Sequence, residues 1–193
     1  AGLERYVHIF AADPKSAHSA HLTAHAVRTA GPFVLRSGET SDWYIDARQT
    51  TFSGAGATLV GAAVVDEVPQ SASAVGGMTM GADPIAIATA MVASLGGRDL
   101  KAFSIRKTAK DHGTGGRLVG PIGPGDSVVA LEDTTTTGSA LVEAIEALHA
   151  EGVRVVRAVA LVDRSGGAAG ERVEQLGVPY IALTTPADLG VEA

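Results

Sequence analysis

The chain has 193 residues, of which 46% are hydrophobic and 24 are glycines, and this size and balance fit one globular domain. With 15 basic against 21 acidic residues the formal charge is −6, so the composition gives no reason to expect nucleic acid or an anionic membrane as partner. The absence of cysteine excludes disulfides, thiolate metal sites and cysteine nucleophiles. No apolar run approaches the roughly 20 residues of a membrane span and no secretory signal is visible, so we expect a soluble, cytoplasmic protein.

Short β-branched runs alternate with alanine-rich stretches along the chain, a pattern typical of an α/β domain with a mostly parallel sheet. The first helix is predicted to begin after the N-cap Asp13, with Pro14 at its first position, and to end near Gly31. Strands are expected at Phe33 to Arg36, Trp43 to Arg48, Ala74 to Gly76, Ala102 to Arg106, Ser127 to Leu131, Arg154 to Val162 and Tyr180 to Leu183.

Two further helices are predicted between these strands. The Asp83-Pro84 pair repeats the capping device of the first helix, and the helix that it opens is apolar on nearly all sides until Gly96-Gly97, so we expect it to be buried against the sheet. Residues 139–151 are predicted to form an amphipathic helix. We expect one domain over residues 1–193, with an N-terminal helix and small segment over about 1–50 and a core over about 70–185.

The most informative segment is the turn after the apolar strand Ser127 to Leu131. Two acids, Glu132 and Asp133, are followed by hydroxyl residues and a glycine where a helix begins. The free amides and the positive end of the helix dipole suit a monophosphate there, whereas the acids suit sugar hydroxyls or a Mg²⁺ ion that a diphosphate brings. A polar turn with a helix cap is the alternative, but an acid pair ahead of Thr-Thr-Gly-Ser favours a ligand site.

Other phosphate-binding loops fit this chain less well. The turn contains no lysine, as a Walker loop requires, and Gly76 to Gly81 lacks the G-x-G-x-x-G spacing of a dinucleotide loop. His21 and His25, four residues apart on the first helix, could bind zinc with a third ligand, but a solvated helix face is the favoured interpretation.

The acid-acid-x-x-Thr-Thr-Gly pattern resembles the motif by which type I phosphoribosyltransferases bind 5-phosphoribosyl 1-diphosphate (PRPP). Arg106 to Gly113 resembles the R-K-x-x-K-x-H-G segment of orotate phosphoribosyltransferases, Phe33 to Asp46 resembles their N-terminal substrate segment, and Val162-Asp163-Arg164 matches a later element. The resemblance spans most of the chain from about Phe33 to Gly190. It implies an α/β, type I phosphoribosyltransferase fold, in which helices flank a central, mostly parallel sheet and a small hood-like region precedes it.

The resemblance also implies an activity, a cofactor and partners. The activity is transfer of the 5-phosphoribosyl group from PRPP to orotate. The cofactor is Mg²⁺, held mainly through the PRPP diphosphate and water and with no direct protein ligand. The working unit is a homodimer in which the 106–117 loop is shared across subunits.

Residue roles follow from the same resemblance. The catalytic residues are expected to be Lys110, His112 and Asp133. Orotate is expected to contact Arg36, Thr136 and Arg164. PRPP is expected to bind Arg106, Lys107, Lys110, His112, Glu132, Asp133, Thr134, Thr135, Thr136, Thr137, Gly138, Ser139 and Ala140.

The residues themselves support these roles while leaving alternatives open. The basic segment 106–112 runs into glycines, so it could act as a mobile loop over a diphosphate, although it could also be a solvated surface. The planar fork of Arg164 suits a carboxylate, with a salt bridge to Asp163 or Glu171 as the alternative. A transferase for another base, such as a purine or uracil, and a non-catalytic PRPP-sensing regulator of the same fold are the rival functions.

Overall fold

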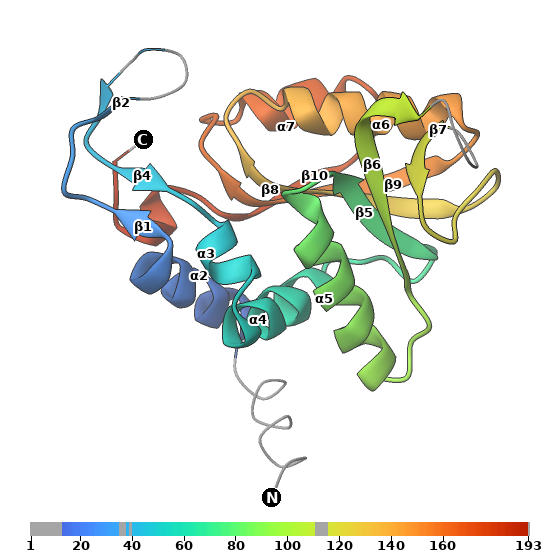
Figure 1. Ribbon diagram of the computed structural model, residues 1–193, viewed down its shortest axis with the longest axis horizontal. Coiled ribbons are helices and arrows are strands. Elements are labelled where there is room, and N and C mark those ends of the chain that lie inside the picture. The colour runs from blue at the N-terminus through green and yellow to red at the C-terminus, as the bar shows by residue number, and fades with distance from the viewer. Residues whose placement is uncertain (1–12, 35–37, 39, 111–115, 193) are drawn as a thin grey trace, which may run out of the picture.

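The computed structural model describes residues 13–34, 38, 40–110 and 116–192. Its centre is a six-stranded sheet with the order β10-β9-β8-β5-β6-β7, parallel except for the antiparallel edge strand β7 (Figure 1). The predicted mostly parallel α/β architecture is therefore confirmed. The strands are β5 (Ala74–Met78), β6 (Lys101–Lys110), β7 (Gly116–Val119), β8 (Ser127–Thr135), β9 (Arg154–Asp163) and β10 (Tyr180–Thr184).

Helices cover both faces of this sheet, and each face has its own apolar cluster. Consecutive residues of a strand point to opposite faces, so Val129 and Leu131 of β8 belong to one cluster and Val128 and Ala130 to the other. One face packs against α4 (Gly54–Val65) and α5 (Ala82–Leu95), with α2 (Pro14–His25) against α4, and the other against α6 (Ser139–Ala150) and α7 (Ala168–Glu174) (Figure 1). Within the described ranges, no helix is long and apolar enough to cross a membrane.

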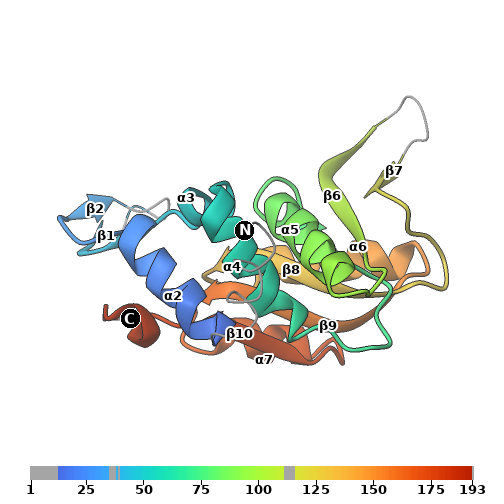
Figure 2. The ribbon, with the colours of Figure 1, turned by 90° about the horizontal axis from the view of Figure 1, so that it is seen from below.

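A smaller region precedes the core. The short strands β1 (Val27–Arg28) and β4 (Tyr44–Ile45) pair antiparallel, as do β2 (Phe33–Val34) and β3 (Thr40–Ser41), and the short helix α3 (Arg48–Thr51) follows. Figure 2 shows this region at one end of the molecule, while β6 and β7 extend from the body at the other. The C-terminal 3-10 helix η1 (Ala187–Leu189) returns to pack against α2.

The predicted helices are present with shifted ends. The carboxylate of Asp13 accepts a hydrogen bond from the Lys15 amide at 3.1 Å, which confirms the first cap. That helix ends at His25 rather than near Gly31, because the chain leaves it to pair Val27 with Ile45.

The prediction for α5 was wrong about its N-cap. Its N-cap is Gly81 and not Asp83, which lies in the first turn. The expectation that it packs against the sheet is confirmed, and it also packs against α4. The side chains of Ile87, Met91 and Leu95 are 56%, 63% and 69% exposed.

Two strand predictions also need correction. The strand expected over Trp43 to Arg48 is only Tyr44–Ile45, and Arg48 already begins α3. Conversely, β8 continues past Leu131 to Thr135, because these residues keep pairing with β9, so the acid pair lies on the strand and not in the turn. The strand expected at Phe33 ends at Val34, and Arg36 lies outside the described residues.

The helices α3, α4 and α7 and the strand β7 were not predicted. The sequence of α4 is rich in glycine and alanine, which favour no element by themselves. Its packing explains that composition, because a Cβ at Gly61 would lie 2.7 Å from the Ala88 carbonyl oxygen of α5. The glycine thus lets the two helices approach closely.

Candidate active site

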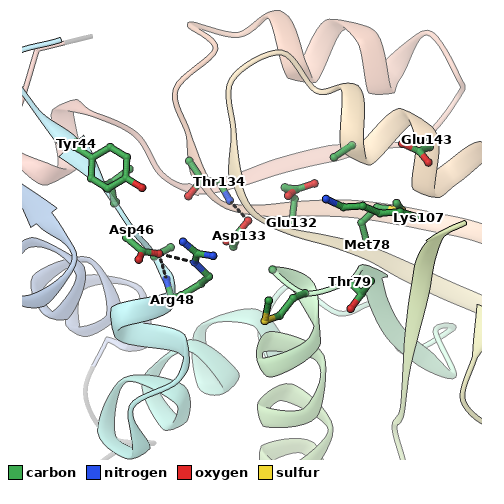
Figure 3. Close-up of a pocket in the computed structure, with 15 residues that line it drawn as sticks. Tyr44, Asp46, Arg48, Met78, Thr79, Lys107, Glu132, Asp133, Thr134 and Glu143 are labelled. Atoms are coloured by element: carbon green, nitrogen blue, oxygen red, sulfur yellow. Dashed lines mark hydrogen bonds and ion pairs between the residues drawn. The ribbon is translucent and has the colours of Figure 1, made fainter. Parts of the chain in front are cut away.

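A cavity of about 740 Å³ opens at the carboxyl ends of the central strands. Strand β5 has β6 on one side and β8 on the other, so the chain connections diverge there and leave a crevice between the ends of β5 and β8. The cavity is lined by residues 78–81 at the end of β5, by 132–134 of β8 and by 44–48 of the N-terminal region, together with Lys107, Ala140 and Glu143 (Figure 3).

The acid pair occupies the middle of this cavity (Figure 3). Asp133 Oδ1 accepts a hydrogen bond from the Thr134 amide at 2.8 Å. A Cβ at Gly81 would lie 2.6 Å from the same oxygen, so any residue other than glycine at position 81 would displace this carboxylate. Glu132 Oε2 is buried and has no hydrogen-bond partner among the described residues. Burial, and then the charge of Asp133, raise the pKa of Glu132, and the charge of Lys107 opposes the rise. The Oε2 atom is therefore available to accept a hydrogen bond from a ligand.

Cations flank the acids from two different regions. Lys107 reaches the cavity from β6, and Arg48 reaches it from α3, with its guanidinium between Asp46 and Asp133 (Figure 3). Arg48 Nε lies 2.7 Å from Asp46 Oδ1, and the bond lowers the pKa of Asp46. The cavity thus offers acceptors for hydroxyl groups beside donors for anionic groups.

The turn between β8 and α6 lies beside the acid pair. Gly138 has a φ of 76° and packs on α7, where a Cβ would lie 2.9 Å from the Ala169 Cα. The Thr135 hydroxyl accepts a hydrogen bond from the Gly138 amide at 2.9 Å and closes the turn. The residues that remain exposed at the beginning of α6 are Thr136, Thr137 and Ser139. Because the first amides of a helix have no partner within it, this turn has the geometry of an anion site.

Arg172 of α7 braces the same turn. Its Nη1 donates hydrogen bonds to the Thr137 carbonyl at 2.7 Å and to the Ser139 hydroxyl at 3.0 Å. The guanidinium therefore fixes the backbone of the turn and adds a positive charge beside it.

Arg164 lies next to the turn, as expected from the neighbouring positions of β8 and β9. Its amide donates to the Thr135 carbonyl at 2.8 Å, and its guanidinium carbon lies 3.9 Å from the centre of the Trp43 ring. Within the described ranges it forms no salt bridge with Asp163 or Glu171, so the alternative interpretation of this arginine is not observed. The Asp163 carboxylate instead accepts hydrogen bonds from the Ser165 amide at 2.7 Å and the Tyr180 hydroxyl at 2.9 Å.

The basic segment is only partly placed. Lys107 lines the cavity, whereas Arg106 does not, and the Arg106 carbonyl accepts a hydrogen bond from Arg117 Nε at 2.7 Å. The backbone of Lys110 ends β6 opposite Gly116. His112 lies outside the described residues, as does Arg36.

Several lining residues were not found from the sequence. Arg48 and Glu143 carry no motif, and Glu143 forms an ion pair with Arg117 of β7. The stretch 78–81 ends the glycine-rich segment Gly76 to Gly81, which lacks the spacing of a dinucleotide loop. Its position after a strand next to the crevice was the usable signal.

The histidines of α2 form no recognisable metal site. The rings of His21 and His25 lie 4.3 Å apart, and His21 Nδ1 is 3.1 Å from the Thr50 hydroxyl. The part of the chain that the structure describes contains no group of three or more His, Asp or Glu side chains that could hold a metal ion.

Comparisons with known proteins agree on one family. The model of the phosphoribosyl transferase domain matches residues 63–175. Orotate phosphoribosyltransferase of Rhodopirellula baltica is 41% identical over 84% of this chain and 87% of its own, and that of Streptomyces coelicolor is 43% identical over 84% and 90%. Mycobacterium tuberculosis orotate phosphoribosyltransferase, in complex with Fe(III) dicitrate, superposes with a TM-score of 0.82 at 31% identity over 92% of this chain and 99% of that one. The same enzyme in complex with PRPP gives a TM-score of 0.76 at 29% identity over the same shares.

Proposed function

The chain belongs to the phosphoribosyltransferase family, and from that premise we propose that it is an orotate phosphoribosyltransferase. It transfers the 5-phosphoribosyl group from PRPP to a nitrogen of orotate, giving orotidine 5′-monophosphate and diphosphate in pyrimidine (UMP) biosynthesis. The observation that carries the proposal is the acid pair at the end of β8, directly beside the exposed turn that opens α6. The cytoplasmic location expected from composition stays a prediction.

The PRPP molecule is proposed to lie along β8 and the following turn. Glu132 and Asp133 accept hydrogen bonds from the ribose hydroxyls, and the amides and hydroxyls of residues 136–140 hold the 5-phosphate. Two observations support this orientation: the exposed hydroxyls of the turn, and Lys107, a cation that lines the same cavity as the acids and could contact the diphosphate. As diphosphate leaves, the ribose carbon gains positive character, and fixed cations near the diphosphate stabilise the charge that develops there.

The donor set of the cavity fits a Mg²⁺ ion that arrives with the diphosphate. The unpartnered Glu132 oxygen and the Asp133 carboxylate are the hard oxygen donors that Mg²⁺ prefers, and they would hold the ion through the ligand and water. When bound, the ion withdraws charge from the diphosphate and makes it a better leaving group.

Orotate is proposed to bind between the ribose and the N-terminal region. Arg164 has an unpaired guanidinium among the described residues and lies beside the turn, where it suits the orotate carboxylate. Thr136 is exposed at the same place, and Arg36 is proposed as a further contact from the resemblance.

Lys110 and His112 are proposed to act on the leaving diphosphate, with either as a possible proton donor. We expect Lys110→Ala to slow the chemical step in single-turnover kinetics by more than about tenfold. The exposed Lys15, far from the cavity on α2, gives a matched control, Lys15→Ala, which should leave that rate unchanged. If the rate of Lys110→Ala stayed within about threefold of the wild type, Lys110 would have no role in the departure of diphosphate.

A homodimer is supported by the exposed apolar stripe of α5, formed by Ile87, Met91 and Leu95. The stripe belongs to a helix whose N-cap residue, Gly81, lines the cavity, so a partner covering it would lie close to the site. If the 106–117 loop serves the partner's site, a mixed dimer of one Lys110→Ala subunit and one Asp133→Asn subunit contains one fully intact site. In that site the first subunit supplies the acid pair and the second supplies the loop. Co-expression should then restore activity well above that of either variant, whereas a loop acting on its own subunit gives no gain.

The function itself is tested by following orotate absorbance with PRPP and Mg²⁺. The purified chain should consume orotate, and replacing orotate by uracil should reduce turnover by several orders of magnitude, because uracil lacks the carboxylate. Equal or faster turnover of uracil would show that the protein is a transferase for a base other than orotate. Binding of PRPP without any turnover would show that the protein is a PRPP-sensing regulator.

A further inference from the structure

Trp43 joins three parts of the molecule that are far apart in the sequence. Its ring is buried, with 7% of its surface exposed, and it packs under the guanidinium of Arg164 at 3.9 Å. Its indole Nε1–H donates a hydrogen bond to the Glu192 carbonyl oxygen at 2.7 Å. The C-terminal segment is itself fixed, because Leu189 is buried in the core cluster. The indole therefore has a defined position against Arg164.

The contact with Trp43 holds the Arg164 guanidinium without using its hydrogen-bond donors. The backbone of Arg164 is held by its bond to the Thr135 carbonyl, but its side chain forms no hydrogen bond or ion pair within the described residues. Stacking occupies one face of the guanidinium plane and leaves the N–H groups at its edge unoccupied. An edge of this kind matches a planar carboxylate, which accepts two parallel hydrogen bonds.

We propose that Trp43 is a positioning residue for the acidic base: its indole, anchored to the C-terminal segment, holds the Arg164 guanidinium with its edge toward the substrate carboxylate. The inference rests on the proposed function, in which Arg164 binds orotate. Trp43 acts through Arg164 and takes no part in bond making. Its loss should therefore weaken the use of orotate and leave the use of PRPP intact.

The test separates the KM values of the two substrates. For Trp43→Leu we expect the KM of orotate to rise roughly five- to thirtyfold, the range that one partly buried cation–π contact supports. The KM of PRPP and the turnover at saturating orotate should stay within about twofold. Trp43→Phe, which keeps an aromatic face but cannot donate to Glu192, should give an intermediate KM of orotate. Phe52→Leu, which shortens an exposed aromatic residue outside the cavity, is the control.

A second readout does not depend on activity. Trp43 is the one tryptophan of the sequence, so the intrinsic fluorescence of the protein reports its surroundings alone. Arg164→Leu should shift this emission, and orotate, after correction for its own absorption, should change the emission of the wild-type protein with a midpoint near its dissociation constant. This measurement also serves if Trp43→Leu fails to fold.

The outcomes distinguish the two proposals. A wild-type protein that consumes no orotate would contradict the proposed function. A wild-type protein that consumes orotate would overturn the role of Trp43 if Trp43→Leu kept the wild-type KM of orotate, if the KM of PRPP rose equally, or if Arg164→Leu left the emission unchanged.

Discussion

The two sides of the cavity are built by different means. One side consists of the ends of β5 and β8, the segment 79–81 and the beginning of α6. Its strands pair over several residues and are covered on both faces. The other side, residues 44–48, follows strands of only two residues and depends on side-chain contacts such as the bond from Trp43 to Glu192. The matched family model covers 63–175, which includes only the first side. The acids proposed to bind PRPP thus lie on a paired central strand, whereas the structure around the base depends on contacts between distant segments.

The largest effect is expected inside the sheet, at Gly77→Ala. A Cβ there would overlap the Leu131 carbonyl oxygen of the neighbouring strand, and backbone in the middle of a sheet cannot move aside. We expect a loss of about 4 kcal/mol or more in the free energy of unfolding, or no folded protein, as measured by urea denaturation. Gly54→Ala is the matched control, because a Cβ there meets nothing within 4 Å. A Gly77→Ala protein as stable as that control would show that the sheet is more compliant than its spacing indicates.

This difference between the two sides also explains what the sequence could predict. The strand Ser127 to Leu131 and the helix after it were predicted because buried strands and amphipathic helices leave patterns within one element. The acid pair and the Thr-Gly turn follow that strand directly, so their closeness in space is guaranteed by their closeness in sequence. The strand at Ala74 to Gly76 was also predicted, although its glycines make β5 a poor strand by propensity. The close packing of the neighbouring strands accounts for these glycines.

The N-terminal side could not be predicted in the same way. Arg48 was placed at the end of a strand but begins a helix, and its approach to Asp133 joins residues 85 positions apart, which no local pattern records. The contact of Trp43 with Arg164 is of the same kind. Tertiary contacts decide the conformation of such short elements, so the sequence indicates their chemistry but not their partners.

The next largest effect concerns how α2 attaches the N-terminal region to the core. His18 is fully buried and neither ring nitrogen has a hydrogen-bond partner among the described residues. Burial, with a smaller contribution from the charge of His21, lowers the pKa of His18 from 6.5 to about 4. Between these pH values the unfolded chain binds the proton and the folded protein does not, so stability is complete above pH 6.5 and falls as the pH drops toward 4.

His18→Leu should remove this part of the acid sensitivity. Relative to the variant, the wild type should lose roughly 2 to 3 kcal/mol of unfolding free energy between pH 7 and pH 4, as measured by urea titrations at each pH. The exposed His149 offers the control His149→Leu, which should keep the wild-type profile. Parallel profiles for wild type and His18→Leu would mean that His18 is solvated or paired in solution.

A smaller effect, on activity alone, is expected where α5 meets the acid pair. In Gly81→Ala the new methyl group would displace the Asp133 carboxylate, but the backbone φ of −61° at Gly81 suits alanine. We therefore expect the KM of PRPP to rise roughly ten- to a hundredfold with little change in melting temperature. Gly123→Ala, where a Cβ meets open space, should behave as wild type in both measurements. Unchanged kinetics for Gly81→Ala would show that the position of the Asp133 carboxylate does not affect PRPP binding.

The smallest effect concerns the other acid and has the opposite dependence on pH to that of His18. Burial and the charge of Asp133 raise the pKa of Glu132 from 4.5 to about 8, so across this range the folded protein binds a proton that the unfolded chain has released. Stability contributed by the protonated form is present below pH 4.5 and is lost as the pH rises toward 8. Glu132→Gln should thus gain about 1 to 2 kcal/mol over wild type between about pH 6.5 and pH 8, whereas the exposed Glu146→Gln should gain nothing. Saturating PRPP and Mg²⁺ should reduce this gain, because a bound cation and ribose hydroxyls favour the ionised Glu132 that only the wild type has. A gain that stayed the same with ligand would show that the unpartnered oxygen of Glu132 does not face the bound sugar.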